Sequence, residues 1–187
     1  MEKLHNLNSL RTMEVITTLA VKSSALIHEA QKERGMSAGF ISSGGTSFAD
    51  ELPAQRATTD KRYTELKELA AVLLKTDLDE GFRNTLTSAL KKMEVLADNR
   101  NAINALKLPS KDAISFYTGM VGAWLEVISY TAKVGSNEIL ARSTTAYLMF
   151  LNGKEMAGRE RATVNAAFAA DRLEWDDFQR FIGLLAN

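Results

Sequence analysis

Two long segments of this chain carry no strong helix-breaking signal, and this constrains the fold more than any other feature. Residues 4–42 predict one very long helix, which the Ser43-Gly44-Gly45 sequence closes. Residues 137–170 predict a second very long helix. Only 2 prolines occur in 187 residues, and Ala, Leu, Lys and Glu dominate the long segments, as is typical of helices. The sequence therefore predicts an all-α fold.

Shorter helices are predicted between and after the two long ones, over residues 53–75, 79–106, 110–133 and 175–185. Apolar residues at helical spacing mark the packing sides of the last two, namely Ile114, Tyr117, Val121, Trp124 and Ile128, then Trp175, Phe178, Phe181 and Ile182. Gly135 and Ser136 separate the helix over 110–133 from the second long helix. Because the connections are short, neighbouring helices should run antiparallel. We expect an elongated up-and-down bundle, a single domain over residues 1–187.

Charge and composition exclude several classes of function. Lys plus Arg and Asp plus Glu number 23 each, and this balance argues against nucleic-acid binding by this domain. Cysteine is absent, and His5 and His28 lie too far apart to suggest a metal site. No catalytic triad or phosphate-binding glycine loop is found, so we expect a non-enzyme without a cofactor. No segment approaches the roughly 18 apolar residues of a membrane span, so any anchor would lie outside this sequence.

Two arginines fall on helical stripes that should face neighbouring helices. The first stripe is Ile16, Ala20, Ser23, Ile27, Ala30, Arg34, Ala38 and Ile41. The second stripe is Leu140, Thr144, Tyr147, Leu151, Lys154, Gly158, Arg161, Asn165 and Phe168. Alternating steps of three and four residues keep one face of a helix inward, so both guanidiniums are predicted to be buried.

A buried guanidinium needs a counter-charge, and the sequence offers none locally. Neither Arg34 nor Arg161 has a carboxylate three or four residues away in its own helix. The counter-charge is then either a bound anion or an acid from another helix, such as Glu126 or Asp60. The missing negative charge makes the two arginines candidate ligand-binding residues.

Other charged residues do have partners at helical spacing. Glu155 has Arg159 four residues later, and Arg56 has Asp60 four residues later. We interpret both as local ion pairs rather than parts of a ligand site, with the Glu155 pair on the outward side of its helix.

Glycines accompany both arginines inside the predicted helices, at Gly35, Gly39, Gly153 and Gly158. Each costs roughly 1 kcal/mol relative to alanine, which close approach of two helices would offset. Such an approach would bring the two arginines into one small cavity, and two guanidinium forks suit a small planar or tetrahedral oxyanion. The candidate ligand-binding residues are Arg34, Arg161, Ser37, Lys154 and Gly158.

Two separated motifs carry a resemblance to a known family. They are Gln31-Lys32-Glu33-Arg34-Gly35 with Ser37-Ala38-Gly39-Phe40, Gln55-Arg56 and Thr59-Asp60, and then Lys154-Glu155 through Ala157-Gly158 to Glu160-Arg161-Ala162. These motifs resemble the nitrate- and nitrite-sensing domain of bacteria, over most of the chain from about His28. The resemblance implies an all-helical input module of a chemoreceptor, sensor kinase or antiterminator. It also implies that Arg34 and Arg161 contact the anion.

The predicted function is therefore sensory. The anion would bind between the two longest helices and displace them, and a separate signalling domain, most simply that of a chemoreceptor, would read the displacement. A periplasmic location is favoured, with a cytoplasmic antiterminator module as the alternative. Apolar residues of the first helix suggest a homodimer, although core packing explains them nearly as well: Leu4, Leu7, Leu10, Val15 and Leu19. The competing hypothesis is a structural or dimerisation bundle whose arginines are paired internally and which binds no small molecule.

Overall fold

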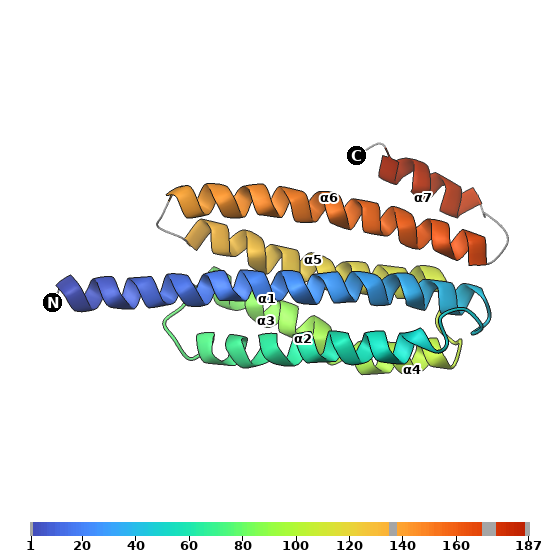
Figure 1. The fold of residues 1–187 in the computed structure, drawn as a ribbon, viewed down its shortest axis with the longest axis horizontal. Helices are drawn as coiled ribbons and strands as arrows, with labels where there is room; N and C mark the ends of the chain where they lie inside the picture. Colours follow the sequence, from blue (N-terminus) through green and yellow to red (C-terminus); the bar gives the residue numbers. More distant parts are fainter. Residues whose placement is uncertain (1, 135–137, 170–174, 186–187) are drawn as a thin grey trace.

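A computed structural model describes residues 2–134, 138–169 and 175–185, and these residues are helical apart from their short connections (Figure 1). The helices are α1 (Glu2–Ser42), α2 (Glu51–Leu73), α3 (Glu80–Glu94), α4 (Leu96–Asn104), α5 (Ser110–Val134), α6 (Glu138–Ala169) and α7 (Trp175–Leu185). The all-α prediction and both very long helices are confirmed, with α1 and α6 in the predicted places.

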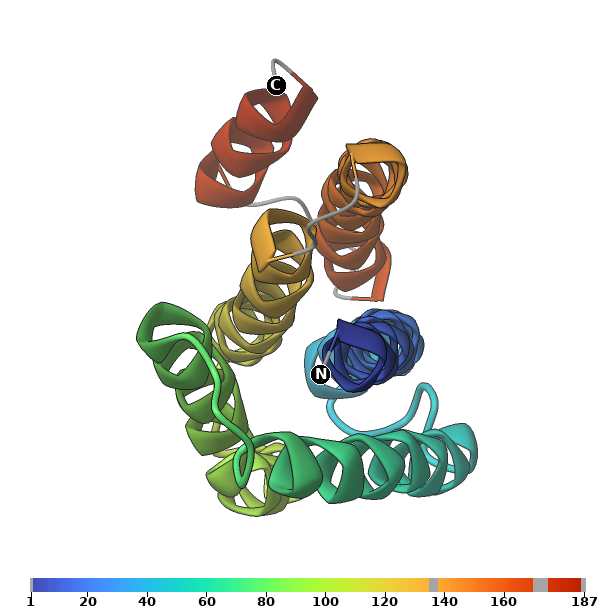
Figure 2. The ribbon, with the colours of Figure 1, turned by 90° about the vertical axis from the view of Figure 1, so that its left-hand side faces the viewer.

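The long helix α1 lies among the other helices and contacts α2, α5 and α6. Figure 2, a view along the bundle, shows α2, α5 and α6 arranged around it. Because three neighbours cover it, α1 buries side chains in several directions rather than along one stripe. This arrangement allows charged residues that are adjacent in the sequence to meet different helices.

The core is formed chiefly by α1, α3 and α5. The predicted packing side of α5 is confirmed, since all five of its residues are buried: Ile114, Tyr117, Val121, Trp124 and Ile128. Four of them, Tyr117, Val121, Trp124 and Ile128, pack with Leu19 and Leu26 of α1 in one continuous cluster, and Ile114 packs separately with Ala38 of α1 and Ala162 of α6. Burying a large apolar side chain completely contributes about 1.5–3 kcal/mol, so this cluster holds α1 and α5 firmly together.

The turn after α1 is the one predicted from Ser43-Gly44-Gly45. Gly44 and Gly45 have φ values of 65° and 89°, a left-handed conformation that glycine adopts without strain. The Gly45 amide donates to the Phe40 carbonyl at 2.8 Å, which ends the helix in the usual C-terminal capping pattern. The chain then reverses, and α2 runs back along α1 (Figure 1).

The predicted helix over residues 79–106 is wrong in one respect, because it is two helices. Val95, with φ −92° and ψ 6°, separates α3 from α4. The two parts follow different neighbours: α3 packs on α5, whereas Arg100 of α4 bonds to Glu33 of α1. A straight helix could not serve both contacts.

The predicted packing side of the last helix is largely wrong. In α7, Trp175, Phe178 and Ile182 are 67%, 38% and 46% exposed, and Phe181 is half-buried. The Trp175 and Phe178 rings lie 5.6 Å apart and pack on each other. Apolar spacing predicted the helix correctly, but this helix covers little of the bundle.

Leu19, suggested as part of a dimer surface, is fully buried in the core, and Val15 packs against the core. The side chains of Leu4, Leu7 and Leu10 and the break at Gly135 and Ser136 lie outside what the structure describes. Among the described helices, none combines the length and the apolar character that crossing a bilayer requires.

Candidate functional site

Arg34 lies at the contact between α1 and α6 and is fully buried, as the first stripe predicted. Its counter-charge is Glu155 of α6. The Arg34 Nη1 and Nη2 atoms lie 2.5 and 3.2 Å from Glu155 Oε1 and Oε2. The acid that the sequence did not supply locally therefore comes from a residue 121 positions away. This ion pair is the centre of the candidate site.

Further polar groups surround the pair. Gln31 of α1 donates from Nε2 to Glu155 Oε2 at 2.8 Å, and Arg34 Nη1 donates to Thr118 Oγ1 of α5 at 2.9 Å. Two guanidinium N–H groups and one amide N–H thus meet the two oxygens of a planar carboxylate. We call Arg34 and Gln31 the Arg34 donor set. Such an arrangement of donors recognises trigonal oxyanions.

The donor set of Arg34 is not fully used. Its Nε atom is buried and has no hydrogen-bond partner among the described residues. A buried N–H without a partner costs about 1–3 kcal/mol. The site therefore retains a donor that an additional or different acceptor could satisfy.

Gly158 allows Arg34 to take this position. A Cβ atom at Gly158 would lie 2.9 Å from Arg34 Nη2, closer than side chains tolerate. Side chains of α1, rather than its backbone, fill the space beside Gly158, so the predicted close approach of two backbones is not what this glycine provides. Gly39 accommodates the ring of Phe48, which lies in the turn before α2, and Gly35 and Gly153 have open space around them, so the prediction is wrong for these three as well.

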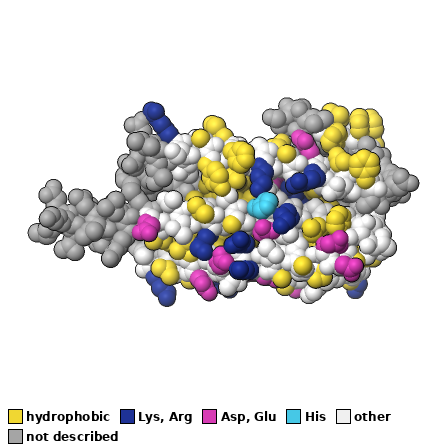
Figure 3. Space-filling view, in the orientation of Figure 1, with side chains coloured by type: hydrophobic (Ala, Val, Ile, Leu, Met, Phe, Trp, Pro, Cys, Tyr) yellow, Lys and Arg dark blue, Asp and Glu magenta, His cyan; other side chains and the backbone are white. Residues whose placement is uncertain are grey.

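Lys154 and Arg161 lie at the surface above this contact rather than inside it. Lys154 is half-buried, and its Nζ lies 2.9 Å from His28 Nδ1 of α1, whereas Arg161 is exposed. Figure 3 shows a histidine with Lys and Arg side chains gathered around it over α1 and α6. We call His28, Lys154 and Arg161 the basic rim.

Positive neighbours on the basic rim disfavour the protonation of His28 and Lys154. Burial, followed by the charge of Lys154, lowers the pKa of His28. Burial, followed by the charge of Arg161, lowers the pKa of Lys154. The rim therefore carries positive charge that an anion would stabilise.

The prediction that Arg161 points inward is wrong. Along the described side chains of α6 the buried residues are Leu151, Glu155, Gly158, Ala162 and Thr163, and the predicted stripe departs from them at Lys154 and Arg161, each one residue before a buried position. Consecutive residues of a helix lie about 100° apart, so a shift of one position exchanges Arg161 for Ala162. The predicted surface pair of Glu155 with Arg159 is wrong for the same reason. Arg159 is half-buried, and its Nη1 lies 3.8 Å from Met156 Sδ.

A second buried charge cluster lies on a neighbouring side of α1. Glu33 is fully buried and receives Arg100 Nε and Nη2 at 2.7 and 2.9 Å and the Tyr117 hydroxyl at 2.7 Å. Arg56 Nε is 3.7 Å from the same carboxylate, and Asp60 accepts from Arg100 Nη1 at 2.7 Å. We call these five residues the Glu33 network.

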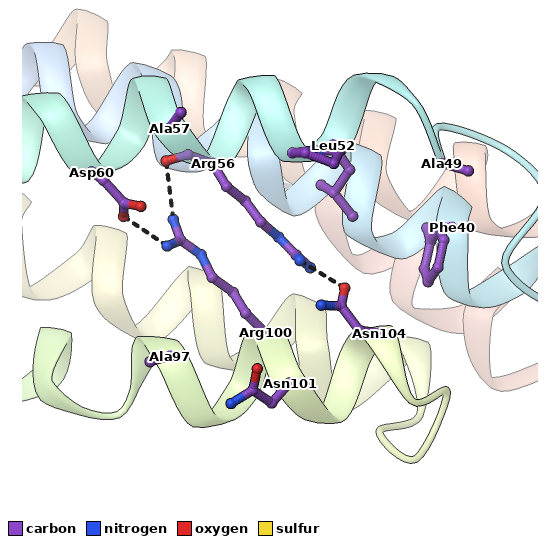
Figure 4. Close-up of a pocket in the computed structure, with 11 residues that line it drawn as sticks. Phe40, Ala49, Leu52, Arg56, Ala57, Asp60, Ala97, Arg100, Asn101 and Asn104 are labelled. Carbon is purple, nitrogen blue, oxygen red and sulfur yellow. Dashed lines mark hydrogen bonds and ion pairs between the residues drawn. The ribbon is translucent and has the colours of Figure 1, made fainter.

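This network borders a pocket of about 550 Å³ between α2 and α4 (Figure 4). Arg56 bonds to Asn104 Oδ1 at 2.7 Å, and Asp60 bonds to Arg100 instead of Arg56. The predicted local pair of Arg56 with Asp60 is therefore wrong. Burial lowers the pKa of Arg56. For Arg100, burial is outweighed by the hydrogen bonds and charge of Glu33 and then Asp60, which raise its pKa.

Ser37 is fully buried one turn after Glu33 and faces Tyr117 of α5. The acids suggested as partners of the buried arginines have other positions: Glu126 is exposed, and Asp60 belongs to the Glu33 network. Among the described residues, no group of three or more His, Asp or Glu side chains is placed to hold a metal ion.

Comparison with known proteins identifies the domain. A family model described as nitrate and nitrite sensing matches residues 25–187. The chain belongs to this family. The match includes Arg34, Glu155 and the basic rim.

Two relatives agree with the family assignment. The nitrate regulatory protein of Klebsiella oxytoca is 29% identical over 160 residues, which are 81% of this chain and 38% of that protein. The solved structure of the NasR transcription antiterminator has the same fold, with a TM-score of 0.89 and 24% identity, over 95% of this chain and 48% of that one. The nitrate- and nitrite-sensing domain thus spans less than half the length of either relative.

Sequence reasoning found Arg34 in this sensing domain but missed Glu155, Gln31 and Thr118. Gln31 and Glu155 lie in the two motifs, so the motifs held the signal. Reading each motif for its full set of polar groups, rather than for its arginine, would have found them. Thr118 has no signal of this kind, because a threonine in an apolar helix is common.

Proposed function

We propose that this domain binds nitrate or nitrite at the contact between α1 and α6, beside the Arg34 guanidinium. Arg34 supplies the donor fork, and Gly158 leaves the space in which that fork lies. Lys154 and Arg161, on the basic rim, attract the anion and neutralise part of its charge. Ser37, buried one turn further along α1, completes the candidate set.

The observation that carries the proposal is the buried Arg34 guanidinium with a donor still unused. Guanidinium stays charged at any relevant pH and presents planar N–H pairs that match two oxygens of a trigonal anion. The membership in a nitrate and nitrite sensing family supports nitrate and nitrite over other anions. The basic rim, which joins α1 and α6 through His28 and Lys154, supports entry from the α1–α6 side.

Calorimetric titration of the domain with sodium nitrate, sodium nitrite, sodium sulfate and sodium chloride tests the proposal. We expect saturable binding of nitrate or nitrite, and a melting temperature that rises with the concentration of the bound anion. Arg34→Ala should abolish the binding. Arg62→Ala, which removes a surface arginine paired with Glu65 at 3.5 Å, is the matched control and should bind normally. No heat and no change in melting temperature at millimolar nitrate would overturn the proposal.

A second candidate function is a structural bundle without a ligand. The closed Arg34–Glu155 pair favours it, because an internal carboxylate already balances the buried charge. Both readings predict that Arg34→Ala destabilises the fold by about 3–5 kcal/mol, since Glu155 is left buried and unpaired. The anion titration therefore decides between them, and stability does not.

For the signal, we propose that anion binding shifts α6 relative to α1 by about 1–2 Å, enough to switch packed helices. A separate domain would read this shift without catalysis by the sensing domain itself. The sequence favoured a chemoreceptor in the periplasm, whereas the two relatives are named as a regulatory protein and a transcription antiterminator. We therefore favour a cytoplasmic regulator, in which any nucleic-acid contact belongs to the output domain. The coding sequence on either side of this domain tests that choice.

We also propose that the domain forms a homodimer. The exposed apolar residues of α6 and α7 support this better than the start of α1 does. Sedimentation of the domain with and without nitrate tests the oligomeric state.

A further inference from the structure

We propose that Glu155 is a built-in competitor of the anion: its carboxylate occupies the Arg34 donor set in the ligand-free state, and the bound anion displaces it. This inference rests on the proposed function and assigns a specific regulatory role to one residue of that site. The sensor would then switch when a free oxyanion replaces the Glu155 carboxylate, which is an oxyanion attached to α6.

The geometry of the pair supports an exchange. The Glu155 oxygens receive Arg34 Nη1, Arg34 Nη2 and Gln31 Nε2 at 2.5, 3.2 and 2.8 Å. A carboxylate and a nitrate or nitrite ion each present two oxygens on a trigonal centre. The same three donors therefore fit either group, and the two cannot occupy them together.

The charges support the exchange as well. Arg34 is fully buried, so it requires one negative charge at all times. Glu155 supplies that charge without ligand, and a monovalent oxyanion supplies it with ligand. The buried charge stays balanced in both states, which a doubly charged anion such as sulfate would not achieve.

A displaced Glu155 has a second partner on its own helix. Arg159 lies four residues later, the favourable spacing and order for a glutamate and an arginine. The Arg159 guanidinium now lies beside the sulfur of Met156, a weak acceptor. Movement of Glu155 from Arg34 to Arg159 would remove the charged link between α6 and α1, and this is the step that could release α6.

The test is to remove the competitor. Glu155→Ala frees the Arg34 donor set, and we expect it to bind nitrate about tenfold or more tighter than the unaltered domain. Formate should also bind to Glu155→Ala, because it replaces the missing carboxylate, and should bind the unaltered domain more weakly, because there it must displace Glu155. Glu160→Ala is the matched control: it removes the same charge from a half-buried position of α6 and should leave nitrate affinity unchanged.

Two further variants keep the test decisive if Glu155→Ala does not fold. Glu155→Gln keeps the shape of the side chain and removes its charge, and nitrate should raise its melting temperature more than that of the unaltered domain. Arg159→Gln leaves the Arg34–Glu155 pair intact and removes the weak contact with Met156 and the second partner of Glu155, and it should weaken nitrate binding severalfold.

The outcomes separate this inference from the proposed function. If the unaltered domain binds nitrate and the two Glu155 variants bind it equally or more weakly, Glu155 is not a competitor, and the proposed function stands. If only the Glu155 variants bind nitrate, the anion does not displace Glu155 in the unaltered domain, and both the exchange and the proposed function are wrong. If neither the unaltered domain nor any variant binds nitrate or nitrite, the proposed function itself is wrong.

Discussion

Glu33 and Arg34 are adjacent in the sequence and both fully buried, yet the two side chains differ in how many charged partners they have. Glu33 receives hydrogen bonds from α4 and α5 and has a second arginine of α2 nearby. Arg34 has one carboxylate, from α6, and a neutral threonine of α5. Redundant partners fix a charge in place, whereas a single partner leaves it exchangeable.

The difference follows from the position of α1 among three neighbours. One side of α1 meets α2, and another side meets α6. The Glu33 side links α1 to α2, α4 and α5, and the Arg34 side links it to α6 and to Thr118 of α5. A signal that moves α6 can therefore leave the Glu33 network unchanged.

The largest expected effect comes from a variant of the Glu33 network, in which the buried charge has several partners. Arg100→Met leaves the Glu33 carboxylate buried with Tyr117 and a more distant Arg56, and we expect a loss of about 3–5 kcal/mol in the free energy of unfolding. Arg56→Met should change stability by less than about 1 kcal/mol, because removing two buried N–H groups without a hydrogen-bond partner offsets the loss of the bond to Asn104 and of the 3.7 Å ion pair with Glu33. Urea unfolding measures both variants. Equal losses would show that the two arginines share the charge of Glu33.

An intermediate effect concerns the space beside Arg34. Gly158→Ala places a methyl group 2.9 Å from Arg34 Nη2, so the guanidinium must move away from Glu155. We expect a loss of about 1–3 kcal/mol and weaker anion binding. Gly153→Ala, in the same helix with open space around it, should instead stabilise by about 0.5–1 kcal/mol. Thermal unfolding and nitrate titration distinguish the two. If Gly158→Ala left stability and nitrate binding unchanged, the Arg34 guanidinium would be free to move.

The smallest effect is a pH dependence at the basic rim. The pKa of His28 is lowered from its ordinary value of 6.5 in the folded domain, so the unfolded chain takes up this proton more readily. The contribution of this group to stability is therefore complete above about pH 6.5 and is lost as the pH falls from there to the lower pKa of the folded state. A bound anion should raise the pKa of His28 by offsetting Lys154 and Arg161. Proton NMR of the imidazole measures both pKa values, and His28→Asn assigns the signal. A midpoint unaffected by nitrate would place the anion away from the rim.

Much of the fold could be predicted from the sequence because it depends on local properties. The apolar spacing of α5, the glycines after α1 and the scarcity of proline act within a few residues, and each prediction was confirmed. The break at Val95 was missed because it depends on which neighbours α3 and α4 meet. The exposed side of α7 was missed because apolar spacing reports a helix and not what covers it.

The site was partly predictable for a related reason. The predicted inward stripe through Arg34 was correct because α1 is covered on several sides. An error of one residue in the position of the stripe therefore changes the predicted burial little. The stripe through Arg161 failed because the outer side of α6 is exposed, and there an error of one residue decides between buried and exposed.

The sequence by itself determined the helical class, the two long helices and a buried arginine without a local counter-charge, since these follow from spacing along one chain. Only the tertiary structure decided that Glu155 balances Arg34 and that Arg161 lies on the rim. Helix rotation and the choice of neighbouring helix set those contacts. Both are fixed by packing between segments more than one hundred residues apart, as the separation of 121 residues between Arg34 and Glu155 shows.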